Sequence, residues 1–141
     1  MIQHEKAYGA LLEPLLSFGQ RMLDDYGAFY PYAAVVGQDG AVELVARELE
    51  DETPHPARLL DILFDALRAH AKDEGCQAYG LCVNVRVVDP RNGEKTDALK
   101  FVFEHRSGEA LDVFFPYKKR HLLPGFRFEK PFAQPADRRV F

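Results

Sequence analysis

The residues best suited to nucleophilic or metal chemistry in this sequence are its cysteines and histidines. The cysteines are Cys76 and Cys82, and the histidines are His4, His55, His70, His105 and His121. A zinc site needs four such ligands at short, regular spacings, and these residues are scattered. We therefore predict no metal and no other cofactor. Two cysteines are also too few for a disulfide framework, and a nucleophilic Cys82 is the catalytic alternative.

Acid–base chemistry has one candidate pair, Glu104 and His105. Neighbouring residues of a strand point to opposite faces of a sheet, so we do not expect these two to act together. His105 is expected at a strand end, facing Glu109. A basic run at residues 118–120 precedes His121 and could bind a phosphate, although a solvated basic loop is the interpretation we favour. Because no phosphate-binding glycine loop, serine-hydrolase elbow, zinc-protease or CxxC motif is present, we predict no catalytic residues and expect a protein that is not an enzyme.

A first helix is predicted in the amino-terminal part of the chain. Leucines at three- and four-residue steps indicate a main helix over residues 13–26, ended by Gly27. Pro14 is placed in its first turn because proline has no N–H to donate. Residues 4–11 are expected to form a separate upstream turn.

A second helix is predicted from the apolar stripe between Leu59 and Ala71. Thr53 is its expected N-cap and Pro54 its first helical residue. Gly75 is expected just past its end, where a left-handed conformation is common.

The remaining segments alternate apolar and polar residues, which is typical of half-buried strands. Strands are expected at residues 29–36, 41–47, 78–88, 98–105 and 110–117, with a short sixth around 126–130. Pro31 should place the first strand along an edge. Paired strands must present their apolar sides to the same face. This requirement fixes an odd number of residues in each hairpin loop. It predicts X-X-Gly loops at residues 38–40, 91–93 and 106–108, each a type I turn followed by a left-handed glycine.

The predicted register gives the sheet one buried and one exposed face. Its inward rows are Leu81 with Phe103 and Leu111, Val83 with Phe101 and Val113, and Val85 with Leu99 and Phe115. The candidate binding residues lie on the opposite, exposed face, and they are Cys82, Asn84, Arg86, Lys100, Val102, Asp112 and Phe114. Such a face can be plain solvated surface with cross-strand ion pairs. Its apolar members favour a contact surface for a partner.

The predicted fold class is α+β, with a mostly antiparallel sheet of five or six strands and two main helices on one face. The order of elements, α-β-β-α-β-β-β-(β), is similar to that of roadblock/longin and profilin-like scaffolds. Such a likeness implies a fold and no function. Residues 1–141 are expected to form a single domain, with residues 131–141 as a loosely ordered tail.

Charge and hydropathy narrow the class of partner. The net charge is −4, with the acidic excess before residue 76 and the basic excess after it. This argues against a nucleic-acid partner, which would favour a strongly basic domain. No apolar run is long enough to span a membrane, so we expect a cytoplasmic protein with no membrane partner. The function we predict is a small protein-binding module that acts through the exposed sheet face, on a protein partner or a second copy. The alternative is a small-molecule binder or hydrolytic enzyme with a pocket near Tyr30, Tyr32 and Tyr117.

Overall fold

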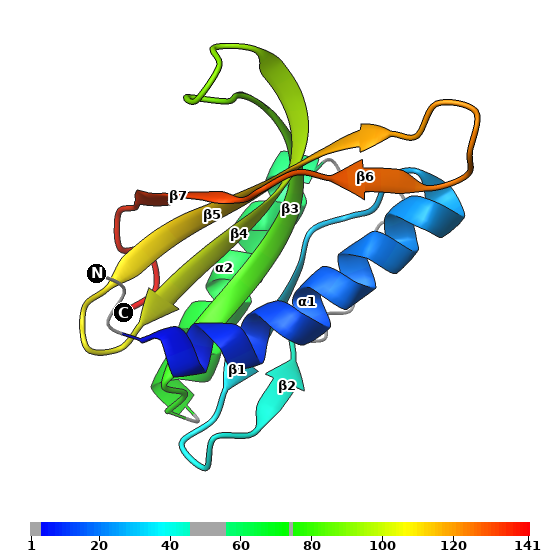
Figure 1. The fold of residues 1–141 in the computed structure, drawn as a ribbon. Coiled ribbons are helices and arrows are strands. Elements are labelled where there is room, and N and C mark those ends of the chain that lie inside the picture. Colours follow the sequence, from blue (N-terminus) through cyan, green and yellow to red (C-terminus); the bar gives the residue numbers. More distant parts are fainter. Residues whose placement is uncertain (1–3, 46–55, 74) are drawn as a thin grey trace.

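The computed structural model describes residues 4–45, 56–73 and 75–141, so the predicted helix start at Thr53 and Pro54 lies outside the described residues. The α+β class and the predicted order of elements are confirmed (Figure 1). In chain order the elements are α1 (Glu5–Tyr26), β1 (Tyr32–Val36), β2 (Val42–Leu44), α2 (Pro56–Asp73), β3 (Ala78–Val88), β4 (Lys95–His105), β5 (Ala110–Lys119), β6 (Phe126–Phe128) and β7 (Phe132–Pro135).

The strands form a single antiparallel sheet in the order β2-β1-β3-β4-β5-β6, and β7 also pairs with β5. The expected sixth strand is present as β6. The sheet has one strand more than predicted, because β7 comes from residues that were expected to form a tail.

Two of the three predicted hairpin registers are confirmed. Val36 lies opposite Val42, and Phe103 lies opposite Leu111. Both loops close as expected, with Gly40 at φ 85° and Gly108 at φ 127°. A side chain at such a positive φ would be strained, which is why glycine occupies these positions.

The predicted register of the remaining hairpin, between β3 and β4, is wrong by one residue, and Pro90 is the reason. In the other two hairpins, the residue before the loop donates its N–H across the turn, as His105 does to the Glu109 carbonyl at 2.8 Å. Pro90 has no N–H, so the closing pair moves back to Asp89, whose N–H donates to the Glu94 carbonyl at 2.8 Å. The loop therefore gains one residue, although Gly93 keeps the expected positive φ of 75°.

This shift overturns the prediction that both helices cover one face. Leu81 lies opposite Val102 and not in a row with Phe103, so each face of the sheet carries apolar residues. The α1 side buries one cluster, including Leu11, Leu15, Ala34, Cys82, Leu99, Phe101 and Phe103. The α2 side buries another, including Leu59, Leu63, Leu67, Ala33, Val35, Tyr79, Leu81 and Val102. The sheet is therefore the middle layer between two helices, as Figure 1 shows.

Helix α1 is one continuous helix, not a turn followed by a helix. It begins at Glu5 and has Pro14 in its interior, so the prediction that Pro14 sits in the first turn is wrong. Burial of Tyr8 and Leu11 upstream of the proline offsets the missing backbone hydrogen bond, since packing supplies most helix stability in proteins. The helix ends as predicted at Gly27, which has φ 72°.

Two glycines allow α1 to pack closely on the sheet. A Cβ at Gly80 of β3 would lie 2.7 Å from a methyl group of Leu15, and a Cβ at Gly19 of α1 would lie 2.8 Å from the Tyr32 hydroxyl oxygen. Larger residues at either position would push the helix and the sheet apart.

Candidate functional site

The seven predicted binding residues do not share a face. Cys82, Asn84 and Arg86 lie on the α1 side, because the corrected register places them opposite odd-numbered residues of β4. Cys82 is fully buried, whereas Asn84 accepts a hydrogen bond from the Tyr117 hydroxyl at 2.6 Å. Arg86 is exposed and pairs with Asp97 at 3.3 Å. The predicted exposed face is thus replaced by two separate environments.

The other four residues lie together on the α2 side. Lys100 and Asp112 form the predicted cross-strand ion pair, with 3.6 Å between Nζ and Oδ2. Val102 is buried in the α2 cluster. Phe114 is also buried, and its ring stacks on Phe132 of β7 at a centroid distance of 4.9 Å. These contacts are internal, so only a small part of this group faces solvent.

The nucleophilic alternative at Cys82 is not supported by its surroundings. Burial raises the pKa of the Cys82 thiol to about 12, and Tyr32 only partly offsets this. The thiolate is the reactive form of cysteine, so this side chain stays protonated and inert at neutral pH.

The three tyrosines of the alternative site do not line one pocket. The Tyr32 hydroxyl donates to the Leu15 carbonyl, and Tyr117 is buried with its hydroxyl on Asn84. Tyr30 lies on a separate hollow beside the end of α1. An apolar hollow of about 350 Å³ lies elsewhere, between α1 and the β5–β7 pair, and its lining includes Tyr8, Leu12, Leu111, Val113, Phe115 and Ala133.

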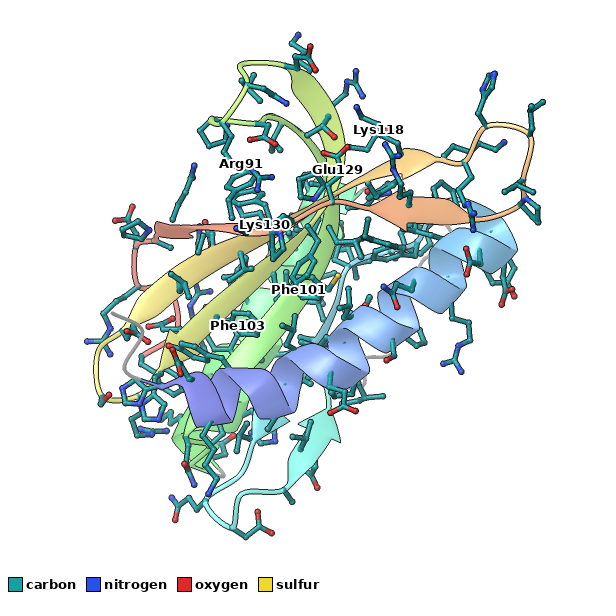
Figure 2. All side chains as sticks on the ribbon, viewed as in Figure 1. Arg91, Phe101, Phe103, Lys118, Glu129 and Lys130 are labelled. Atoms are coloured by element: carbon teal, nitrogen blue, oxygen red, sulfur yellow. The ribbon has the colours of Figure 1, made fainter. Side chains whose placement is uncertain are left out.

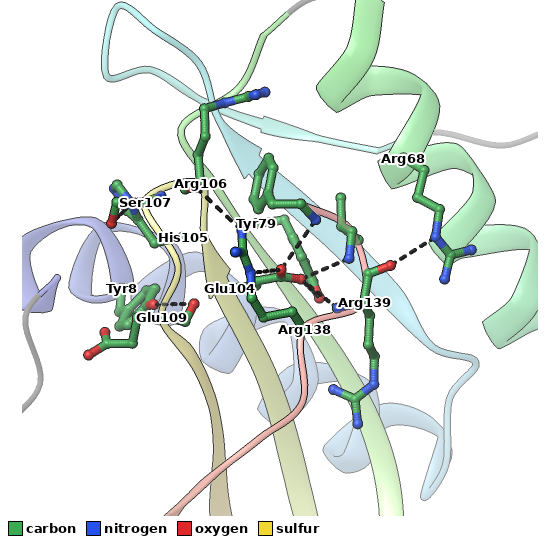
Figure 3. A network of polar contacts seen from close by, with 12 residues as sticks. Tyr8, Arg68, Tyr79, Glu104, His105, Arg106, Ser107, Glu109, Arg138 and Arg139 are labelled. Atoms are coloured by element: carbon green, nitrogen blue, oxygen red, sulfur yellow. Dashed lines mark hydrogen bonds and ion pairs between the residues drawn. The ribbon is translucent and has the colours of Figure 1, made fainter.

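Glu104 is the centre of a polar network that the sequence did not indicate (Figure 3). Its carboxylate is fully buried on the α2 side and accepts a hydrogen bond from the Tyr79 hydroxyl at 3.1 Å. Arg138 lies 3.3 Å from it. The backbone N–H groups of Arg139, Val140 and Phe141 donate to the same carboxylate at 3.0, 2.9 and 3.2 Å.

This network replaces the loosely ordered tail that was expected for residues 131–141. After β7, residues 136–141 pass over the α2 side of the sheet toward Glu104. The Arg139 carbonyl accepts a hydrogen bond from Arg68 of α2 at 2.9 Å, and the Arg106 guanidinium lies over the Phe141 ring. These contacts could not be predicted from the side chains of the segment. The Glu104 carboxylate binds backbone N–H groups, which every residue except proline has.

His105 lies on the opposite face from Glu104, as predicted, and it meets a partner that the sequence did not indicate. Its ring stacks on His4 at a centroid distance of 3.6 Å. The Ser107 hydroxyl lies 2.7 Å from Nε2 of His4 and 3.0 Å from Nδ1 of His105. Nδ1 also accepts the Ser107 N–H at 3.1 Å. These contacts of Ser107 order the turn between β4 and β5, so we assign the His4–His105–Ser107 cluster a structural role.

The histidine stack predicts that stability falls on mild acidification. Burial first, and then His4, lower the pKa of His105, although Glu109 opposes them. The folded state therefore favours neutral His105. Its contribution is fully present above the unfolded pKa of about 6.5 and is lost as the pH falls from there through the lower pKa of the folded state. The imidazole is partly solvated, so we expect a loss below about 1 kcal/mol between pH 7.5 and 5.5.

Urea titrations of the natural protein and of His105→Gln at the two pH values would measure this loss. The natural protein should lose more stability than the variant. An equal loss in both proteins would assign the pH dependence to other groups.

One stretch of β3 is paired with a described strand on one side only. Strand β1 pairs with β3 only over residues 78–82, whereas β4 pairs with β3 over residues 78–88. Within residues 4–45, 56–73 and 75–141, no other strand pairs with Val83–Val88. Figure 1 shows this part of the β3–β4 hairpin rising past β1. We call Val83–Val88 the β3 edge.

The backbone of the β3 edge has hydrogen-bonding groups that no described strand pairs with. The Asp89 N–H points to β4, where it meets the Glu94 carbonyl. Backbone direction alternates along an antiparallel strand, so the even-numbered residues direct their N–H and C=O groups away from β4. These residues are Asn84, Arg86 and Val88, the first two of which are among the predicted binding residues.

No protein-family model, curated protein or solved structure matches the chain. The likeness to roadblock/longin and profilin-like scaffolds is therefore one of element order alone. Within the part of the chain that the structure describes, no cluster of side chains could hold a metal ion, and no helix is long and apolar enough to cross a bilayer.

Proposed function

We propose that this protein is a protein-binding module that adds a strand of another chain to its β3 edge, and that the other chain is a second copy of itself. The observation that carries the proposal is the β3 edge, which has β4 on one side and no described strand on the other. Unpaired strand edges are templates for pairing with another chain.

The sequence of the β3 edge is complementary to itself in one antiparallel register. With Val85 opposite Val85 of the second copy, Asn84 lies opposite Arg86 and Val83 lies opposite Val87. Apolar residues then meet apolar residues on the α2 side, and no like charges face each other. Shifting the centre by one residue places Arg86 opposite Arg86, which is unfavourable.

The same register uses the outward-facing backbone groups. Asn84 and Arg86 of the two copies exchange N–H and C=O groups, which gives four hydrogen bonds between the chains. Each such bond contributes about 0.5–1.5 kcal/mol. The pairing would also cover the half-buried valines Val83, Val85 and Val87. We expect a weak dimer, with a dissociation constant roughly between the micromolar and the millimolar range.

Arg86→Pro should weaken this dimer at least about tenfold, because it removes two of the four inter-chain donors. The Arg86 N–H points away from β4, so proline leaves the pairing of β3 with β4 in place. Arg86→Ala is the matched control, since it removes the same exposed side chain and keeps the N–H. Sedimentation velocity over a wide concentration range would measure the dissociation constants.

Amide hydrogen exchange would show where the two copies meet. Exchange at Asn84 and Arg86 should slow as the protein concentration rises. A natural protein that stays monomeric at high concentration would contradict the proposal. A dimer in which these two amides exchange at an unchanged rate would contradict it as well.

The apolar hollow between α1 and β5 supports a second candidate function, the binding of a small apolar ligand. Leu111, Val113 and Phe115 are half-exposed there, so α1 leaves part of β5 uncovered. Ala133→Phe should fill the hollow and abolish binding of an apolar fluorescent probe. Gln134→Phe, on the opposite face of β7, is the control that should retain binding. Equal probe binding by both variants would contradict this candidate.

A further inference from the structure

The hairpin between β5 and β6 is a second exposed feature, remote from the β3 edge. Its strands pair over Tyr117–Lys119 and Phe126–Phe128, and the loop closes with the Arg120 N–H on the Gly125 carbonyl at 3.0 Å. Figure 1 shows the loop projecting beyond the rest of the sheet, near the end of α1. We call residues 118–127 the basic hairpin.

Positive charge dominates the basic hairpin. A shallow hollow on it is lined by Lys118, Lys119, Arg120, His121, Leu123 and Arg127. Glu129 is the single acidic residue between Pro116 and Lys130. It lies 3.6 Å from Lys118 and 3.9 Å from Arg127, and Figure 2 shows its position beside Lys118 and Lys130. Asp24 of α1 approaches the loop at Gly125. These two acidic groups do not balance the basic residues, so the hairpin has a positive net charge.

Two leucines occupy the tip of the same loop. Leu122 is 96% exposed, the highest value among the large apolar side chains that the structure describes as exposed, and Leu123 is 56% exposed. Leu122 also has φ 67°, and it is the one described non-glycine residue with a positive φ. Water is an unfavourable environment for two adjacent leucines, so the tip is suited to an apolar or interfacial environment.

We propose that the basic hairpin docks this protein on an anionic lipid bilayer, with Leu122 and Leu123 inserted at the interface and the basic side chains on the lipid phosphates. Apolar residues flanked by lysine and arginine bind such surfaces by combining apolar burial with attraction to anionic headgroups. This attachment is peripheral and needs no spanning helix. It revises the expectation of no membrane partner, which rested on the lack of a spanning segment.

The leucines favour a bilayer over a nucleic acid as the anionic partner. A nucleic acid would neutralise the same basic side chains but would leave the leucines in water. Single-stranded nucleic acids are usually bound by aromatic side chains that stack on bases. The loop from Arg120 to Gly125 contains no phenylalanine, tyrosine or tryptophan, and the ring of Phe126 packs on Tyr117.

A tryptophan reporter tests insertion directly, because the chain contains no tryptophan. The emission of Leu122→Trp should shift to the blue on vesicles that contain phosphatidylserine, and not on pure phosphatidylcholine vesicles. Leu44→Trp is the matched control, since Leu44 is 66% exposed on β2, and its emission should not change. A shift with Leu44→Trp, or none with Leu122→Trp, would overturn the proposal.

Charge variants test the electrostatic part in a vesicle sedimentation assay. Each basic residue near an anionic surface contributes about fivefold in affinity. The double variant Lys119→Gln with Arg120→Gln should therefore bind about 25-fold more weakly. Lys6→Gln with Lys72→Gln removes the same charge from exposed positions on α1 and α2, outside both the basic hairpin and the β3 edge, and this variant should bind like the natural protein. Equal weakening by both pairs would show a non-specific charge effect and overturn the site.

Competing anions distinguish a bilayer from other phosphate sources. Inorganic phosphate at physiological ionic strength should not release the protein from vesicles. Binding to a single-stranded oligonucleotide without binding to vesicles would overturn the proposal and would assign the hairpin to nucleic acid. Neither outcome depends on whether the β3 edge forms a dimer.

Discussion

Glu104→Ala should lower the free energy of unfolding by about 3–5 kcal/mol, the cost of removing one partner from a buried charged network. The Glu104 carboxylate is fully buried and accepts hydrogen bonds from Tyr79 and from three successive backbone N–H groups. Alanine would leave these donors without their acceptor and would remove the carboxylate that pairs with Arg138. Urea or thermal unfolding would measure the loss.

Amide exchange separates a local from a global effect of Glu104→Ala. The N–H groups of Arg139, Val140 and Phe141 should exchange much faster in the variant, because residues 136–141 lose their anchor. Asp97→Ala is the control, since Asp97 is an exposed carboxylate paired with Arg86. An exposed pair contributes less than about 1 kcal/mol. A similar small loss for Glu104→Ala would contradict the role of this network.

Phe101→Ala should cost about 3–5 kcal/mol of unfolding free energy, the usual range for a phenylalanine removed from a core. Phe101 is fully buried under α1, opposite Cys82 on β3 and Val113 on β5. Its ring meets the edge of Phe115 at a centroid distance of 5.5 Å. The alanine would leave a cavity where the strands and helix cannot close up, because their backbones are held by the sheet.

Leu44→Ala is the matched control for Phe101→Ala. Leu44 is 66% exposed on the short strand β2, so its removal should change stability by less than about 0.5 kcal/mol. Chemical denaturation of the two variants would compare the effects. A loss below about 1 kcal/mol for Phe101→Ala would show that this ring is not central to the α1-side core.

Local patterns predicted the elements well because each depends on a few neighbouring residues. The glycine at the end of α1 and the X-X-Gly loops at residues 38–40 and 106–108 follow from backbone geometry within a turn. The register of the hairpin between β3 and β4 could also be predicted from the sequence. Pro90 stands where the closing donor is needed, and its missing N–H moves the closing pair back to Asp89.

The prediction that the seven candidate binding residues share one exposed face is wrong because of the pairing between β3 and β4. A shift of one residue between β3 and β4 moves every side chain of one strand to the other face relative to its neighbour. Cys82 thereby became a core residue beneath α1, and Lys100 and Asp112 came to the α2 side. With the shift, both faces of the central strands are apolar, so each helix can cover its own face.

The sequence by itself determined the α+β class, the order of elements and the left-handed turn glycines, because these depend on residue types at short range. Only the tertiary structure decided which strand faces meet which helix, that Glu104 anchors residues 136–141, and that the β3 edge stays unpaired where β1 ends. These features depend on contacts between residues far apart in the chain, and no local pattern encodes where a neighbouring strand stops.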